Sequence, residues 1–134
     1  MAQQTFDRTN VYKDFDLSFT FNPLTGDIGS KTDVNAINQS IRNLINTNFY
    51  ERPFKPEMGS NIRAILFEQA DVITTLDLKQ SITEVITNYE PRVTLQDVII
   101  QDEPDKNAYN ISIIYLINGQ NNVAQFDTIL KRLR

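Results

Sequence analysis

The chain has 134 residues, enough for one domain of ordinary size, and its 13 basic and 17 acidic residues give a net charge of −4. It contains neither cysteine nor histidine. Disulfides, thiolate catalysis and sulfur-ligated metal are therefore excluded, and the commonest general base and zinc ligand are missing. We expect no catalytic residue, no metal site and no cofactor.

The charge and hydropathy patterns also restrict the classes of partner that we expect. No apolar run reaches the roughly 20 residues of a membrane span, and Met1–Asn10 is polar, without the apolar core of a signal peptide. The densest basic cluster, Lys131–Arg134, is typical of a solvated or paired chain end. We expect no nucleic-acid partner, no membrane partner, and a chain that begins in the cytoplasm. Residues 1–13 are predicted to be a flexible segment, and residues 14–134 a single domain.

The first third of the chain predicts a strand, a turn and a helix. Asp16–Phe21 alternates polar and apolar residues, which is typical of a strand, and Asn22–Asp27 is rich in turn formers. A helix can begin at Thr32 or Asp33, either of which can cap it. Its apolar stripe at helical spacing is Ile37, Ile41, Leu44, Ile45 and Phe49.

The middle third predicts a shaped connection and two further helices. Glu51–Glu68 holds two prolines and Gly59, which is expected to supply a positive φ or a close backbone approach. A short helix can start at Ser60 or Asn61 and present Ile62, Ile65, Leu66 and Phe67. A longer helix is predicted from Thr74, with Asp77 as a capping-box acid, and with Leu78, Ile82, Val85, Ile86 and Tyr89 along one side. Pro91 ends it.

The last third changes to a period of two. Strands are predicted over Val93–Gln101, Tyr109–Ile117 and Val123–Arg132, with turns at 102–107 and 118–121. Helices followed by consecutive hairpin strands indicate an α+β fold, in which helices pack on one face of a small antiparallel β-meander as a two-layer single domain.

Two proline-centred motifs stand out as candidate partner-binding sites. Glu90, Pro91 and Arg92 lie where the long helix meets the first meander strand, and we expect Arg92 to reach outward. A carboxylate at a helix C-terminus is unfavourable unless a cation compensates. The motif is therefore either a helix stop with an internal ion pair or a rigid charged pair that docks another subunit.

The second motif is Arg52, Pro53 and Phe54. In its structural interpretation Phe54 packs into the core and Arg52 pairs with an acid such as Glu90 or Glu57. In its functional interpretation the loop docks a partner.

A glycan hydrolase is the enzymatic alternative. Such enzymes need two carboxyl groups about 5–9 Å apart, one with a raised pKa. The available glutamates are Glu51, Glu57, Glu68, Glu84 and Glu90, and no spacing singles out a pair. The chain also lacks tryptophan for sugar stacking, so catalysis is disfavoured.

A series of motifs resembles one protein family. They are Lys13–Phe19, Thr25-Gly26-Asp27, Asp33 with Ala36-Ile37 and Ser40–Leu44, Glu51–Phe54 with Pro56 and Gly59, Leu66-Phe67-Glu68, and Tyr89–Val93. In this order, over about residues 13–117, the chain resembles the baseplate wedge, or sheath-initiator, proteins of contractile-tailed phages. The family is sometimes labelled lysozyme-like, and a member occurs in type VI secretion baseplates. One departure is Glu51, where the family often has Gly or Ser.

The resemblance implies an α+β fold and a structural role in the virion, in the tail baseplate. It implies that the partners are other baseplate wedge proteins and the tail sheath protein, and that about six copies of the chain are present per baseplate. In the family, the motif that matches Glu90-Pro91-Arg92 is linked to attachment, and a sheet edge receives arms of the first sheath ring. A meander leaves unpaired edge groups that allow strand addition. We expect the last strand to be that edge, with Thr128, Ile129 and Leu130 as its contact residues. The alternatives are the same subunit in a type VI or extracellular injection machine, and a regulatory module like a bacterial anti-adaptor of similar fold.

Overall fold

The computed structural model describes residues 13–15, 17, 21–23, 27–28, 30–120 and 122–133. The chain divides into two compact units, Met1–Gln39 and Ser40–Arg134. None of the helices in the described ranges has the length and apolar character needed to cross a bilayer.

The first unit contains short antiparallel strand pairs. β1 (Lys13–Phe15) pairs with β4 (Ser30–Thr32), and β2 (Phe21–Asn22) pairs with β3 (Asp27–Ile28). The predicted strand over 16–21 lies mostly outside the described residues; Leu17 is in a turn and Phe21 begins β2. The predicted flexible segment lies outside them too, except for Lys13. The proposed domain division therefore stays a prediction.

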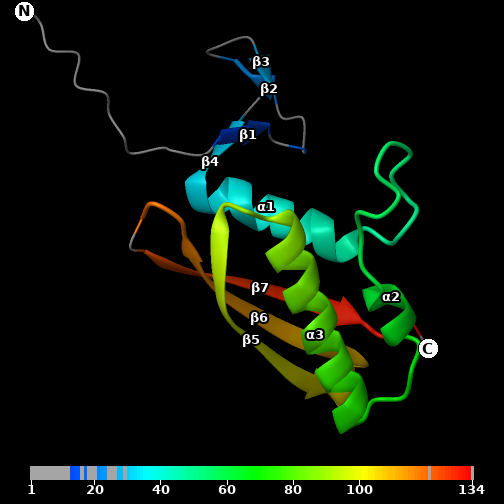
Figure 1. Ribbon diagram of the computed structural model, residues 1–134. Coiled ribbons are helices and arrows are strands. Elements are labelled where there is room, and N and C mark those ends of the chain that lie inside the picture. Colours follow the sequence, from blue (N-terminus) through cyan, green and yellow to red (C-terminus); the bar gives the residue numbers. More distant parts are fainter. Residues whose placement is uncertain are drawn as a thin grey trace, which may run out of the picture. The chain divides into compact units, whose positions relative to one another are not determined.

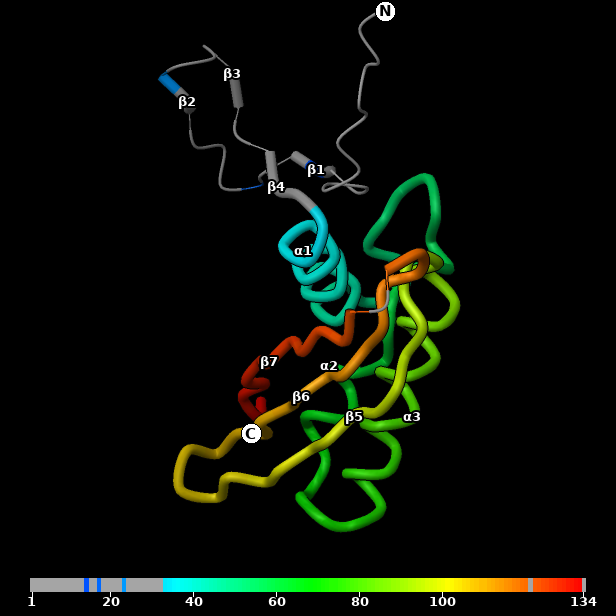
Figure 2. The backbone as a smooth tube through the Cα atoms, turned by 90° about the vertical axis from the view of Figure 1, so that its left-hand side faces the viewer, coloured from blue at the N-terminus to red at the C-terminus, as the bar shows by residue number. Residues whose placement is uncertain are grey.

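The second unit is built on a three-stranded antiparallel meander (Figure 1). The strands β5 (Val93–Glu103), β6 (Ala108–Ile117) and β7 (Val123–Lys131) follow one another in sequence and in space. A short 3₁₀ turn, Pro104–Lys106, joins the first two. Figure 2 shows α3 beside β5, with β7 on the other side of β6. The sheet therefore has two edges, β5 and β7.

Helices cover one face of this sheet. They are the C-terminal part of α1 (Asp33–Asn46), α2 (Ile62–Ile65) and α3 (Val72–Tyr89). Alternate residues of β6 are at most 1% exposed, namely Tyr109, Ile111, Ile113, Tyr115 and Ile117. Their neighbours along the strand, from Asn110 to Leu116, are half-buried. One fully covered face and one partly open face confirm the predicted α+β class.

The helix boundaries correct two predictions. α3 begins at Val72, and its cap is Asp71, whose carboxylate accepts the Thr74 N–H at 2.7 Å. Thr74 is thus inside the helix, and Asp77 is one turn too late to act as a capping-box acid. The earlier helix α1 ends at Asn46, so Phe49 is not part of its stripe and is 44% exposed. Both errors arise because apolar spacing alone does not mark where a helix begins or ends.

Candidate partner-binding surfaces

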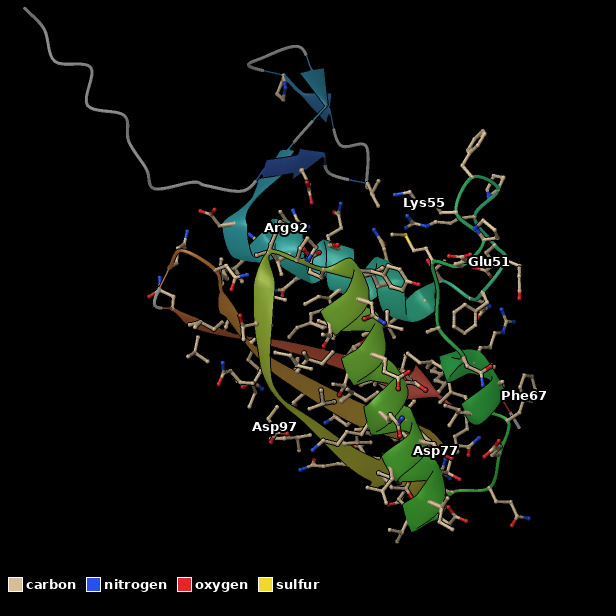
Figure 3. All side chains as sticks on the ribbon, viewed as in Figure 1. Glu51, Lys55, Phe67, Asp77, Arg92 and Asp97 are labelled. Atoms are coloured by element: carbon tan, nitrogen blue, oxygen red, sulfur yellow. The ribbon has the colours of Figure 1, made fainter. Side chains whose placement is uncertain are left out.

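Glu90 and Arg92 form an internal ion pair at the connection between α3 and β5. Arg92 donates from Nε to Glu90 Oε1 at 2.7 Å and from Nη2 to Oε2 at 2.9 Å. Glu90 is 2% exposed, although it follows the last helical residue, and the Arg92 side chain is 22% exposed. Figure 3 places Arg92 at this turn of the chain. The bidentate geometry fixes the two side chains relative to each other.

Burial and pairing act on Glu90 in opposite directions. Burial alone raises the pKa of this carboxyl, but hydrogen bonds from Arg92 and Ser40 and the charge of Arg92 outweigh it, so that the pKa is lowered. Glu90 is therefore a charged group held inside the fold. The expectation that Arg92 reaches outward is wrong, because its guanidinium turns back to neutralise that buried charge.

The connection between α1 and α2 is a fixed loop. Its ends meet where Ser60 N–H donates to Thr47 O at 3.0 Å, and a Cβ at Gly59 would lie 2.5 Å from the backbone carbon of Asn48. The close approach expected of Gly59 is confirmed. Tyr50 has φ 67°, a strained value for a bulky residue, and its N–H donates to Pro56 O at 2.8 Å.

This loop presents Phe54 to solvent. Phe54 is 97% exposed, and Arg52 contacts the Met58 sulfur at 3.0 Å. The Tyr89 hydroxyl of α3 ties the loop down by donating to Glu57 O at 2.7 Å. The structural interpretation of the Arg52-Pro53-Phe54 motif is wrong on both points, since Phe54 is not in the core and Arg52 does not pair with Glu90 or Glu57. A strained, anchored loop that holds an exposed aromatic ring is typical of a binding surface.

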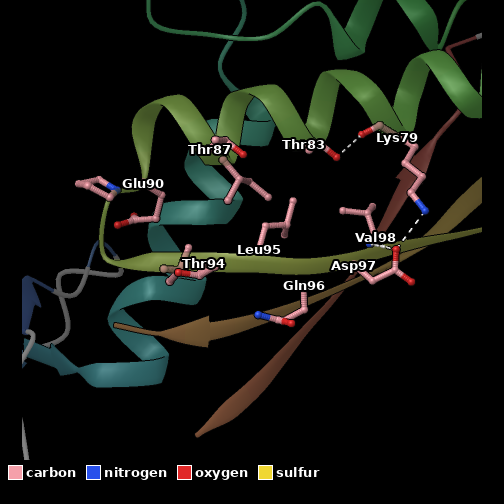
Figure 4. A pocket seen from close by; sticks show the side chains of 12 residues that line it. Lys79, Thr83, Thr87, Glu90, Thr94, Leu95, Gln96, Asp97 and Val98 are labelled. Carbon is pink, nitrogen blue, oxygen red and sulfur yellow. Dashed lines mark hydrogen bonds and ion pairs between the residues drawn. The ribbon is translucent and has the colours of Figure 1, made fainter. Parts of the chain in front are cut away.

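The β5 edge of the sheet is obstructed. Its register with β6 shifts between Leu95 and Asp97, which marks a β-bulge. The Asp97 carboxylate accepts the Val98 N–H at 2.8 Å and pairs with Lys79 of α3 at 3.0 Å (Figure 4). A groove of about 540 Å³ runs between α3 and Val93–Val98. Sequence reasoning missed this arrangement, because the residues that meet are 18 positions apart.

The β7 edge is regular. Its register with β6 continues unbroken from the Lys131–Ala108 pair to the Val123–Leu116 pair. Of the three predicted contact residues, Leu130 faces the helices and is 8% exposed, Thr128 is half-buried, and Ile129 faces away and is 55% exposed. Arg132 closes the strand end: its guanidinium pairs with Asp102 and lies 4.7 Å from the centre of the Tyr109 ring.

The acids in the described part of the chain show no raised carboxyl pKa. A glycosidase general acid needs a raised pKa, but the carboxyl shifts resolved in the described residues are all downward, at Glu51, Asp71, Glu90, Asp97 and Asp127. Within the described part of the chain, no group of three or more acids is placed so that it could hold a metal ion. What the geometry offers is a set of surfaces: the Glu90–Arg92 connection, the exposed loop and the β7 edge.

Comparison with known proteins identifies the family of this chain. The family model described as "Baseplate wedge protein gp25" matches residues 31–122. The baseplate wedge protein gp25 of Enterobacteria phage T4 is 29% identical over 89 residues, which are 66% of this chain and 59% of the T4 protein. The match thus spans less than two thirds of that relative.

Solved structures share the fold. A Geobacter sulfurreducens protein named a tail lysozyme has a TM-score of 0.66 and 24% identity, over 75% of this chain and 93% of its own. A chain of the anti-feeding prophage baseplate has a TM-score of 0.63 and 24% identity, over 92% and 87%. A chain of the pyocin R2 baseplate has a TM-score of 0.51 and 15% identity, over 81% and 95%. Since the gp25 family model covers well over half of the chain, this protein belongs to the gp25 family of baseplate wedge proteins, components of contractile tails.

Proposed function

We propose that this protein is a structural subunit of the virion tail baseplate that starts sheath assembly. It docks on other wedge proteins, in about six copies per baseplate, and offers the β7 edge to extended arms of the tail sheath protein. The observation that carries the proposal is the difference between the edges: β7 is regular, whereas β5 is obstructed by a bulge and an ion pair. Strand addition needs unpaired backbone groups in register, and β7 is the edge that presents them.

Docking uses the two proline-centred motifs in different ways. Glu90 is buried and cannot meet a partner directly, so it acts by holding Arg92. Pro91 is exposed and Arg92 is partly exposed, and these two form the contact surface at the turn. Phe54 adds a protruding aromatic anchor on the fixed loop; aromatic anchors of this kind often dominate interface energetics.

A pair of proline variants tests the β7 edge. Successive N–H groups of a strand point to opposite sides, so either Thr128→Pro or Ile129→Pro removes an outward-facing donor and leaves the bonds to β6 intact. We expect that variant to fold and to assemble baseplates with bare tubes, visible by electron microscopy. The matched control is Gln96→Pro at the β5 bulge, which should give normal sheaths.

The outcome separates the edge from the fold. Circular dichroism and thermal melting identify which variants are folded. Full-length sheath on every folded β7 variant would show that the sheath arms dock elsewhere, with the segment around Leu17–Phe21 as the next candidate.

We also infer that the protein is not an enzyme. Glu90 is the most buried of the candidate glutamates, and its lowered pKa opposes a role as general acid. A turbidity assay on peptidoglycan should show no clearing. Clearing that is lost in Glu84→Gln or Glu90→Gln would contradict this inference.

A further inference from the structure

A cavity of about 270 Å³ lies beside the C-terminal half of β7. Its inner walls are Ile45 from α1, Ile62 from α2, Leu66 directly after α2, and Leu130 from β7, each at most 8% exposed. Small-molecule pockets occupy about 300–1,000 Å³, so this cavity is smaller than a typical ligand site. Asn46 and Asn48 also line it, so its buried walls are apolar and its border is polar. Its size suits a single side chain.

The cavity lies where an added strand would place such a side chain. It is bordered by three consecutive β7 residues, Ile129–Lys131, on one side and by the helices on the other. In a strand paired with β7, alternate side chains point toward the helix layer, in the same row as Leu130. Past the end of β7, the Leu133 N–H donates to Leu66 O at 3.2 Å, and both residues line the cavity. A strand along β7 therefore directs an inward-facing residue into the cavity.

The rim of the cavity is positively charged. Arg63 and Lys131 are exposed, and among the described lining residues no acid accompanies them. Within the described chain neither cation has a hydrogen-bond or ion-pair partner. The pKa of Glu51 is lowered mainly by hydrogen bonds from Asn48, and Arg63 is the weakest of its influences. The two cations are therefore available to a carboxylate on an incoming segment.

We propose that this cavity is a socket that selects the strand added to β7. It accepts one large aliphatic side chain facing the helices. The residues on either side of it in the added strand point to the opposite face, which Lys131 shares, so Lys131 favours an acidic residue there. Main-chain bonds at the edge supply affinity for any extended segment, and the socket supplies sequence preference. This inference rests on the proposed strand addition at β7 and names the chemistry of the segment.

The socket can be tested with short peptides whose termini are capped and which are added to the full chain. The probe is Thr-Thr-Glu-Leu-Glu-Thr-Thr-Thr, compared with a version in which Ala replaces Leu and one in which Lys replaces both Glu. Titration to millimolar peptide is followed by the backbone amide signals of β7 in the full chain. We expect the Leu peptide to bind about tenfold more tightly than the Ala peptide, from the buried aliphatic area. The Lys-flanked peptide should bind more weakly than the Glu-flanked one.

Variants of the chain locate the preference. Leu133→Trp, at a 39% exposed rim position, should fill the socket and abolish the preference for Leu over Ala; Val123→Trp, at a 67% exposed position at the other end of β7, should keep it. Lys131→Glu should reverse the preference for Glu over Lys, and Lys106→Glu should not. If the Leu and Ala peptides shift the β7 amide signals equally, the socket proposal is wrong, but strand addition at β7 is still supported. If no peptide shifts the β7 signals, strand addition itself is wrong.

Discussion

The two edges of one small sheet differ in what they allow. Along β5 the ladder is interrupted by a bulge, Asp97 occupies the Val98 N–H, and Lys79 from α3 holds that carboxylate in place. Along β7 the ladder is continuous, and a cavity with an apolar interior lies beside it. A meander always produces two edges, so topology alone does not choose between them. In this protein a few side chains make the choice.

This asymmetry has a physical consequence. A sheet with two open edges can add strands on both sides and assemble without limit, and proteins prevent this with bulges and charges at an edge. Because β5 is obstructed at its bulge and β7 is regular, the proposed strand addition is restricted to one side. The proposed role, starting a polymer in one direction, needs that restriction.

The largest expected effect on stability comes from breaking the Glu90–Arg92 ion pair, which lies just before β5. Arg92→Ala leaves the buried Glu90 carboxylate without its cation at the start of β5. Removing one partner of a buried ion pair costs about 3–5 kcal/mol, and we expect about 3 kcal/mol here because Arg92 keeps some exposure. Urea unfolding measures the loss, with Arg52→Ala as the exposed control. A loss no greater than that of Arg52→Ala would mean that the pair does not anchor β5.

The Glu90–Arg92 pair should also make the free energy of unfolding depend on pH. The folded pKa of Glu90 lies below its ordinary value of 4.5. Its contribution to stability is therefore complete above about pH 4.5 and is lost as the pH falls through the lowered folded value. The stability gap between the wild type and Arg92→Ala should narrow between neutral pH and about pH 3. Urea unfolding over this range measures the gap, and a constant gap would rule out ionised Glu90 as its source.

Opening the closed edge should change association more than stability. Asp97→Ala frees the Val98 N–H and releases Lys79, and we expect weak self-association through β5, with a dissociation constant on the order of 1 mM. Sedimentation over a range of protein concentrations detects it. Asp127→Ala removes a similarly exposed acid from β7 and should remain monomeric. Identical behaviour of the two variants would mean that the bulge alone closes β5.

The smallest effect on stability is expected in the loop between α1 and α2 that carries Phe54. Phe54→Ala should change the free energy of unfolding by no more than about 0.5 kcal/mol, because the ring is 97% exposed. The control is Phe126→Ala, where the ring is 4% exposed and about 3–5 kcal/mol should be lost. We expect folded Phe54→Ala to be incorporated poorly into baseplates while its β7 edge still binds an added strand. Normal incorporation would remove Phe54 from the docking surface.

Local sequence signals determined much of this fold. The change of apolar period from 3.6 to 2 located the helices and the meander, Pro91 fixed the end of α3, and Gly59 marked a close backbone approach. The family could be identified because its motifs recur in order along the chain. These features depend on neighbouring residues, for which spacing and residue type carry the physics directly.

Only the tertiary structure decided how the motifs are used. Glu90 is held in its buried position by Ser40, 50 residues earlier in the sequence, together with the neighbouring Arg92. Phe54 is exposed because backbone bonds and Tyr89 hold its loop away from the core. Likewise, β5 is closed by Lys79 and Asp97, and the socket at β7 needs walls from α1 and α2. The local Glu90–Arg92 pair was one of two interpretations that the sequence allowed, and only the structure decided between them. The other outcomes are set by residues far apart in sequence, whose meeting depends on packing.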